Sequence, residues 1–451
     1  MEHHVTLAEM LDARERRVFR QHKLQAKYPM SMVCFTMNIA GPEKNSPMIR
    51  RGFELGIKYL KEQLNALKIQ PVYSEKIDEP TGNEAYYLID ADPLFIKEIT
   101  CEIEDGSGLG RLFDMDVLDP SGEKVERSAL GLPPRSCLIC GGPARDCARS
   151  RTHTVEQLHA KTMEILTNAA EEEDASLAAR LALRALLYEV CTTPKPGLVD
   201  REGNGSHKDM DIFTFMDSAS ALWPYFETCT RIGRQTAGQM AAQTFQQLRF
   251  SGRRAEAAMF SATKGINTHK GAIFSMGILC GALGRLSREE WTCSEKVLKE
   301  CAAMTKGLIA FDFAGLSEEN AVTVGQKLYL RHHITGVRGQ MEDGLPAVRD
   351  AGLPALKEGI ARGLSVNDAG CGALLALMTA AVDTNLIARG SLSVWKNTVE
   401  EIKEVLSGHP YPDRQTLCRL DRQFTEKNLS PGGSADLLAV CYLLYFLEIE
   451  G

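Results

Sequence analysis

The change in hydrophobic pattern near residue 170 constrains the fold of this chain more than any other feature. Before it, strand-like segments such as 31–40 and 111–118 alternate with the helical spacing of 50–67. From Leu177 onward the pattern is helical nearly throughout. Three segments there predict buried helices: 272–283, 369–382 and 435–449. We therefore expect a multidomain protein, with an N-terminal α/β or α+β domain followed by a mainly α-helical domain.

The length of 451 residues is too great for one ordinary hydrophobic core. We expect domains at 1–165 and 177–451, joined by a linker at 166–176. The acidic run 171–174 interrupts the pattern there, and its alternative interpretation is the exposed start of the next helix.

Composition excludes some functions and suggests a compartment. The net charge of -7 argues against binding a nucleic-acid backbone, although small anions need only a local group of cations. The N-terminus carries His, Glu and Asp where a secretory leader would be apolar, and the run 437–447 is too short to span a bilayer. With 13 scattered Cys, we expect a cytoplasmic protein with reduced thiols.

Two carboxylates follow a Gly-rich turn at Gly110. Because strand side chains repeat every second residue, Asp114 and Asp116 are predicted to face the same way. Such a pair is costly without a cation between its members, and Mg²⁺ is the usual cation for oxygen ligands. The motif predicts metal-assisted phosphoryl or nucleotidyl transfer, and its alternative is a pair of solvated surface acids.

A cysteine-rich segment follows the strand-like region. One Cys3His set has the spacing of zinc ligands: Cys137, Cys140, Cys147 and His153. Arg149 and Arg151 lie in the same segment, and arginine forks bind phosphate well, so anion contact is the competing interpretation. The third interpretation is that these residues are ordinary buried cysteines.

In the helical part, polar motifs stand at the ends of predicted helices. The loop 192–200 is stiffened by two prolines and carries Lys195 and Asp200. Nearby His207 precedes a second acidic pair, Asp209 and Asp211, which predicts a metal site, with Asp209 as ligand, or a general base.

Three further motifs open apolar helices. His269 and Lys270 stand at one helix start, a plausible phosphate site. Asp368 precedes another apolar helix, where its structural alternative is an N-cap. The Gly432-Gly433-Ser434 turn permits close approach of a ligand to the backbone, with capping by Ser434 as the alternative.

These motifs resemble two known families. Gly110-Arg111-Leu112-x-Asp114-x-Asp116-Val117, together with segments 134–140 and 147–153, resembles the citrate lyase holo-acyl-carrier-protein synthase (apo-citrate lyase phosphoribosyl-dephospho-CoA transferase) family. Segments 193–200, 207–210, 265–271 and 430–436 resemble the triphosphoribosyl-dephospho-CoA synthase family. Together the resemblances cover nearly the whole chain, in the order of fused bifunctional versions.

The resemblance implies two reactions. The C-terminal domain would join ATP to 3'-dephospho-CoA through the 2'-hydroxyl, with adenine leaving. The N-terminal domain, with a nucleotidyltransferase-like fold, would transfer the product to a Ser of the citrate lyase acyl carrier (gamma) subunit and release diphosphate. Malonate decarboxylase, whose carrier uses the same group, is the rival destination, and a non-catalytic zinc-stabilised adaptor is the rival class.

The resemblance also implies roles for these residues. Asp114 and Asp116 would hold Mg²⁺, and three arginines would neutralise the leaving diphosphate: Arg135, Arg149 and Arg151. Lys195, Lys270 and the Gly432-Gly433 turn would bind the triphosphate. A carboxylate would stabilise the positive charge on the ribose and another would accept the hydroxyl proton. The unranked candidates for these two tasks are Asp200, Asp209, Asp211 and Asp368.

Overall fold

The protein forms two compact units in a computed structural model that describes residues 4–451. The N-terminal unit ends at Glu172 and the C-terminal unit begins at Glu173. The segment 166–176, expected to be a linker, is helical and lies within α5 (Val155–Cys191). Both ends of this segment are held by packing. Leu166 lies in the core of the N-terminal unit, and buried Asp174 forms an ion pair with Arg234 at 3.3 Å.

The N-terminal unit is an α+β fold around one sheet. The strands are β1 (Ser31–Met37), β2 (Tyr73–Glu79), β3 (Gly82–Ile89), β4 (Phe113–Leu118) and β5 (Lys124–Val125). Their order is β2-β3-β1-β4-β5, and every neighbouring pair is antiparallel. The helices are α1 (Leu7–Lys27), α2 (Pro47–Ala66), α3 (Pro93–Asp105) and α4 (Ala144–Ser150).

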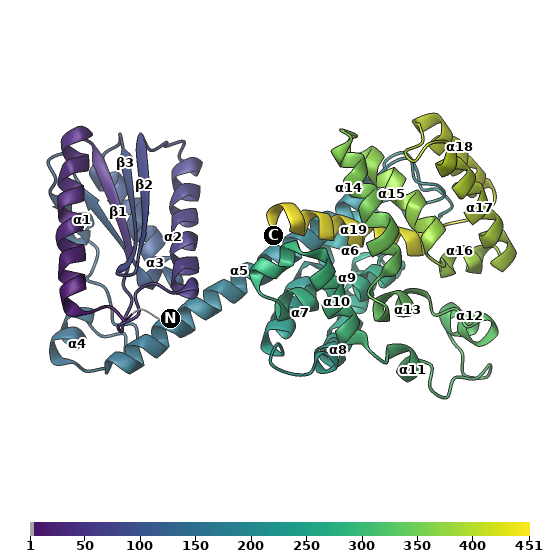
Figure 1. The fold of residues 1–451 in the computed structure, drawn as a ribbon, viewed down its shortest axis with the longest axis horizontal. Coiled ribbons are helices and arrows are strands. Elements are labelled where there is room, and N and C mark those ends of the chain that lie inside the picture. The colour runs from purple at the N-terminus through teal and green to yellow at the C-terminus, as the bar shows by residue number, and fades with distance from the viewer. Residues whose placement is uncertain (1–3) are drawn as a thin grey trace. The chain divides into compact units, whose positions relative to one another are not determined.

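Strand alternation divides the apolar side chains of this unit between two layers. Phe113, Met115 and Val117 pack into the larger core with α2 and α3. The opposite face carries Met32 and Cys34, which pack under α1. Figure 1 shows α1 and α2 on opposite sides of the sheet. The sequence did not reveal β2, because its composition is mostly polar and it lies at the edge of the sheet.

The C-terminal unit is helical. After α5 its helices are α6 (Ile212–Ala221), α7 (Trp223–Gln235), α8 (Ala241–Ala262), α9 (Lys270–Arg285), α10 (Ser294–Thr305), α11 (Leu308–Asp312), α12 (Val324–His332), α13 (Gly336–Glu342), α14 (Leu353–Ala361), α15 (Val366–Ala380), α16 (Thr384–Arg389), α17 (Leu392–Gly408), α18 (Arg414–Glu426) and α19 (Gly432–Glu450).

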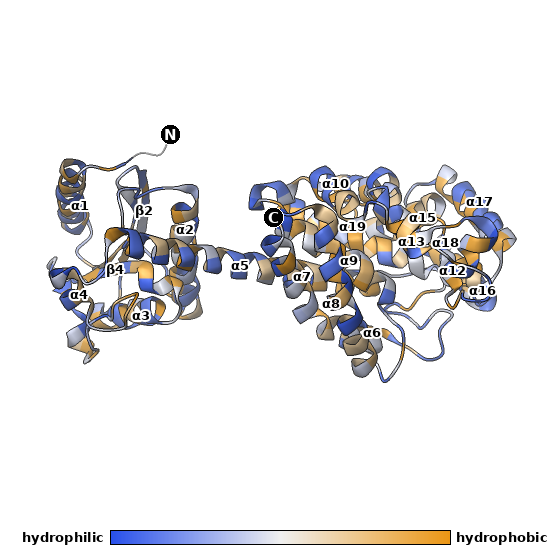
Figure 2. Cartoon of the chain, turned by 90° about the horizontal axis from the view of Figure 1, so that it is seen from below, coloured by the Kyte–Doolittle hydropathy of each residue, from blue (hydrophilic) through white to orange (hydrophobic). Residues whose placement is uncertain are grey.

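The three helices expected to be buried form the centre of this unit. They are α9, α15 and α19, whose apolar residues belong to one large cluster. Figure 2 shows the apolar colouring of α9 and α19 within the bundle. α19 is long and apolar enough to cross a membrane by length and composition alone, but 67% of that stretch is buried inside the protein.

Helices α7 and α9 approach each other through glycine. A Cβ on Gly284 would lie 2.0 Å from the carbonyl oxygen of Thr230, and one on Gly233 would lie 2.0 Å from that of Gly281. Because both obstacles are backbone atoms, a side chain at either position requires the helices to move apart.

We expect Gly284→Ala to destabilise the C-terminal unit by about 1–3 kcal/mol, the usual cost of overpacking a core. Thermal or urea unfolding measures the change. The matched control is Gly238→Ala, since a Cβ there meets nothing within 4 Å. Equal stability of the two variants would contradict the close approach.

Candidate active sites in the two units

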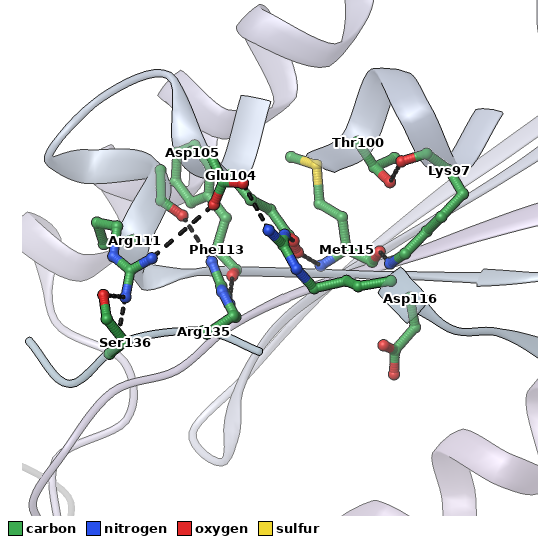
Figure 3. Close-up of polar contacts among 12 residues, drawn as sticks. Lys97, Thr100, Glu104, Asp105, Arg111, Phe113, Met115, Asp116, Arg135 and Ser136 are labelled. Carbon is green, nitrogen blue, oxygen red and sulfur yellow. Dashed lines mark hydrogen bonds and ion pairs between the residues drawn. The ribbon is translucent and has the colours of Figure 1, made fainter. Parts of the chain in front are cut away.

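The paired carboxylates of the N-terminal unit lie on one face of β4, as the strand periodicity predicted. Along β4 burial alternates, with Phe113, Met115 and Val117 buried and the intervening acids more exposed. The register places Asp114 beside Thr36 and Asp116 beside Cys34 of β1. In Figure 3, Asp116 projects from the opposite side of β4 to Lys97 and Glu104.

The electrostatics of this pair favour a cation. Desolvation and then the Asp116 carboxylate raise the pKa of Asp114, while Lys124 acts in the other direction. Lys124 forms a 2.6 Å ion pair with Asp116. No hydrogen bond to the Asp114 carboxylate occurs within residues 4–451. Asp114 is therefore open to a ligand, whereas Asp116 already shares a positive charge.

The turn that leads into β4 is tied to the cysteine-rich segment (Figure 3). Arg135 donates to the carbonyl oxygens of Phe113 at 2.7 Å and Gly110 at 3.2 Å. Arg111 donates to the Ser136 hydroxyl at 3.2 Å. The guanidinium of Arg135, expected to neutralise diphosphate, thus holds the backbone just before Asp114. Arg149 and Arg151 are exposed at the end of α4.

The four expected zinc ligands come together in space. One ligand atom from each of Cys137, Cys140, Cys147 and His153 lies within 4.8 Å of the others. Among the described residues this is the only group of three or more metal-ligating side chains so close together. Although desolvation acts the other way, backbone N–H groups and neighbouring thiols lower the pKa of Cys137 to about 7. The hydrogen bond between Cys147 and Cys140 is the largest of the causes that raise the pKa of Cys147 to about 11.

In the C-terminal unit the scattered polar motifs converge on one cavity of about 560 Å³. This volume suits a small-molecule ligand. Seven of the expected site residues line it: Lys195, His207, Asp209, His269, Lys270, Gly432 and Gly433. The first residues of α9 and α19 belong to this lining, and helix N-termini favour bound anions.

A buried ion pair anchors one wall of the cavity. Lys195 is 1% exposed and pairs with Glu189, which is 7% exposed. The Lys195 ammonium also donates to the Glu189 carbonyl oxygen at 2.8 Å. Lys195 is thus held by contacts inside the protein. Lys270 is about half-exposed and pairs with Glu256 at 2.9 Å. Lys270 is the more accessible of the two cations.

Both predicted histidines face the cavity in the neutral form. Burial, and then Arg389, lowers the pKa of His207, although Asp209 acts in the other direction. Burial lowers the pKa of His269 to about 3, and Lys195 adds to the effect.

The hydrogen bonds around His269 define its tautomer. Thr268 donates to the Ser218 hydroxyl at 2.7 Å, which leaves the Ser218 proton for Nδ1 of His269, also at 2.7 Å. The ring proton then resides on Nε2, which is buried without a partner among the described residues. His269 therefore offers one N–H donor at the cavity.

Three predicted carboxylates lie outside the cavity lining. Asp200 accepts from the Thr193 hydroxyl at 2.8 Å and the Lys195 N–H at 2.9 Å, so it shapes the loop. Asp211 is the N-cap of α6. Asp368 lies in the first turn of α15, whose N-cap is Ser365. These carboxylates organise the backbone around the site, and Asp209 alone of the four lines the cavity.

Sequence reasoning missed three acids that line the cavity: Glu189, Asp383 and Asp436. Asp383 accepts from the N–H of Ser434 at 2.8 Å and its hydroxyl at 2.9 Å, and it also caps α16. Burial, followed by Glu189 and then Asp383, raises the pKa of Asp436 well above its ordinary value. Asp436 lies in the segment 430–436, but only its packing could reveal that it lines the cavity.

Paired carboxylates in one unit, and a cavity with cations, carboxylates and helix N-termini in the other, suit an enzyme that handles phosphorylated substrates. Comparison with known proteins makes this class specific. Residues 5–169 match the family model for CitX, apo-citrate lyase phosphoribosyl-dephospho-CoA transferase. Residues 175–451 match the model for CitG, ATP:dephospho-CoA triphosphoribosyl transferase.

Individual relatives give the same result. Protein CitXG of Leuconostoc mesenteroides is 34% identical over 98% of this chain and 97% of the relative. Protein CitXG of Haemophilus influenzae is 34% identical over 99% of this chain and 97% of the relative. A 2-(5''-triphosphoribosyl)-3'-dephosphocoenzyme-A synthase of Pectobacterium atrosepticum is 44% identical over 59% of this chain and 87% of the relative. The chain belongs to the CitXG family and joins a CitX and a CitG domain in one polypeptide.

The neutral state of His269 makes stability depend on pH. Its folded pKa of about 3 lies below the ordinary value of 6.5, so below pH 6.5 the unfolded chain binds more protons. The contribution of His269 is thus complete above pH 6.5 and is lost as pH falls towards 3. We expect His269→Asn to flatten the decline in melting temperature of the C-terminal unit between pH 6.5 and 4.

The matched control is His332→Asn, which replaces an exposed histidine outside the cavity lining. It should keep the wild-type profile. Parallel pH profiles for wild type and His269→Asn would show that His269 is not held neutral.

Proposed function

We propose that the protein makes and attaches the prosthetic group of citrate lyase. In the C-terminal unit, ATP and 3'-dephospho-CoA give 2'-(5''-triphosphoribosyl)-3'-dephospho-CoA and adenine. The N-terminal unit then transfers this product to a Ser of the apo acyl carrier (gamma) subunit and releases diphosphate. The observation that carries the proposal is the presence of both family matches on one chain, supported by full-length relatives named CitXG.

The synthase cavity suits a nucleoside triphosphate. Lys270 and the first turns of α9 and α19 supply positive potential on its wall. Arg389 lines the same cavity and donates to Nδ1 of His207 at 3.2 Å, which adds a cation at the His207 side. We assign the triphosphate to these groups rather than to Lys195, because Lys195 is buried in its pair with Glu189, whereas Lys270 is about half-exposed.

Two carboxyl groups fit the glycosyl-transfer step. The C1'–adenine bond breaks, a bond forms from the 2'-oxygen of dephospho-CoA to C1', and the hydroxyl proton leaves. Asp209 is exposed at the cavity and is our choice as the acceptor of that proton. Asp436, whose pKa is raised, retains a proton that it can give to the departing adenine. The N–H of His269 is a further donor for the base.

The transferase step needs the β4 acids. Asp114 and Asp116 fit a Mg²⁺ ion because both carboxylates lie on one face of β4, where desolvation and then the charge of Asp116 raise the pKa of Asp114. Mg²⁺ there would stabilise charge on the reacting phosphate, the chemistry of a nucleotidyltransferase-like unit. At the other site, the alternative role of Asp209 is as a ligand for the Mg²⁺ that accompanies ATP, in place of its role as proton acceptor. Exposed Arg149 and Arg151 are available to the leaving diphosphate.

The destination we propose is citrate lyase rather than malonate decarboxylase, since the N-terminal match is to the apo-citrate lyase transferase model. A non-catalytic adaptor does not account for the synthase cavity or the family matches. We place both reactions in the cytoplasm, consistent with thirteen cysteines that are all unpaired.

One experiment tests both steps. The protein is incubated with ATP, Mg²⁺ and dephospho-CoA while adenine is measured, and apo carrier is then added while diphosphate and carrier mass are measured. Parallel reactions with the citrate lyase and malonate decarboxylase carriers compare the two destinations. Adenine formation without any gain in carrier mass would overturn the second step.

We expect Asp114→Ala to lower transfer to the carrier about 100-fold or more, because metal-based charge stabilisation is worth several kcal/mol. Adenine release should be unchanged, since the C-terminal unit has its own site. The matched control, Asp90→Ala, removes an exposed acid beyond the end of β3 and should retain both activities. Loss of both activities in folded Asp114→Ala protein would contradict independent sites.

We expect Lys270→Ala to raise the KM for ATP about tenfold, the effect of losing one charged hydrogen bond. Initial rates of adenine release over a range of ATP concentrations measure it. Lys299→Ala removes an exposed lysine of α10 outside the cavity lining and serves as control. An unchanged KM in Lys270→Ala would remove this lysine from the phosphate site.

A further inference from the structure

We propose that Cys137, Cys140, Cys147 and His153 form a closed structural zinc site that holds Arg135 and Ser136 against the turn before Asp114. This inference goes beyond the two reactions, and only its predicted effect on carrier transfer rests on the proposed transferase function.

The ligand geometry fits a tetrahedral ion. With Zn–S bonds of about 2.3 Å, sulfur atoms around one zinc lie about 3.8 Å apart. The ligand atoms here all lie within 4.8 Å of one another, and the sulfur atoms of Cys140 and Cys147 are 3.4 Å apart. A small adjustment of the four side chains brings all four ligand atoms to bonding distance of one centre. Three thiols and one imidazole are a ligand set of structural zinc sites and leave no open position for substrate.

Two local observations point to an ion. Nε2 of His153 is buried and has no hydrogen-bond partner among the described residues, a costly state that coordination would relieve. The Cys137–Cys140 turn is also built for metal. The Ile139 N–H donates to the Cys137 sulfur at 3.5 Å, and Gly141 closes the turn with a left-handed φ of 72°.

Apart from Leu138, which packs against the core of the unit, and the contacts of Arg135 and Ser136, the segment has little other stabilisation. Between residues 131 and 154, Cys137 is the one buried residue, and the regular structure is the short helix α4 together with an isolated bridge from Ser136 to Pro143. So little apolar burial does not hold a chain in one conformation, whereas a structural zinc contributes folding free energy directly.

The position of the cluster indicates that the ion orients the turn before Asp114. Ser136 precedes the first ligand, Cys137, and accepts from Arg111, while Arg135 donates to the carbonyls of Gly110 and Phe113. An ion that holds Cys137 therefore also holds Arg135 and Ser136 in their hydrogen bonds to the turn before Asp114. Arg135 and the four ligands act as positioning residues for the transferase site.

The test begins with the metal alone. Full-length protein purified under reducing conditions should contain one zinc per chain, and Co²⁺ substitution should give the intense visible and charge-transfer bands of tetrahedral thiolate coordination. Cys140→Ser and Cys147→Ser should lose the zinc, whereas Cys418→Ser, a partly buried thiol of the C-terminal unit, should keep it. Should the serine variants fail to fold, mercurial titration of wild type provides the same answer, with zinc released as the thiols react.

Functional readouts then separate positioning from chemistry. Loss of zinc should lower transfer to the carrier about 10- to 100-fold, the cost of a small misplacement of reacting groups, and should lower the melting temperature of the N-terminal unit. Adenine release should stay at the wild-type rate. Addition of Mg²⁺ should not restore carrier transfer to the zinc-free protein.

Three results would overturn the proposal. They are reduced wild-type protein that neither contains zinc nor takes it up at equimolar concentration, zinc retained in both serine variants, and thiols that react only after a reductant is added. The last result would identify a Cys140–Cys147 disulfide in place of the ion.

Discussion

The synthase cavity depends on the buried ion pair between Lys195 and Glu189. Two charges so far from water are tolerated because each neutralises the other and Lys195 also donates to a carbonyl. Removing one partner of such a pair typically costs about 3–5 kcal/mol. The pair fixes the start of the 192–200 loop to the last turns of α5. Asp200 then closes that loop from the other end, which leaves His207 and Asp209 beside the cavity.

The sequence predicted the fold best where one periodicity dominated. Period-2 alternation placed Asp114 and Asp116 on one face of a strand, and continuous apolar runs identified α9, α15 and α19. The antiparallel order of the sheet was not predictable, because it depends on pairing between distant segments. The polar edge strand β2 has no hydrophobic pattern of its own and is held by its pairing with β3.

Prediction of the site was limited in the same way, because the site also depends on contacts between distant segments. Chemistry-bearing motifs could be recognised one by one, but their convergence on a cavity is a property of packing between helices far apart in the chain. Asp436 and Asp368 both stand near the start of an apolar helix, yet only Asp436 lines the cavity. Residue type could not separate them. Conversely, the Cys3His spacing was informative because its four members lie within 17 residues of chain, where local geometry brings them together.

The apolar helix α19 has a consequence for biosynthesis. It supplies the centre of the helical core, and its partners α9 and α15 precede it along the chain. A ribosome therefore makes most of the bundle before its central member emerges, so the apolar sides of the earlier helices stay exposed during translation. The helical unit can complete its core only after α19 has been synthesised, so until then its exposed apolar surface is prone to aggregation.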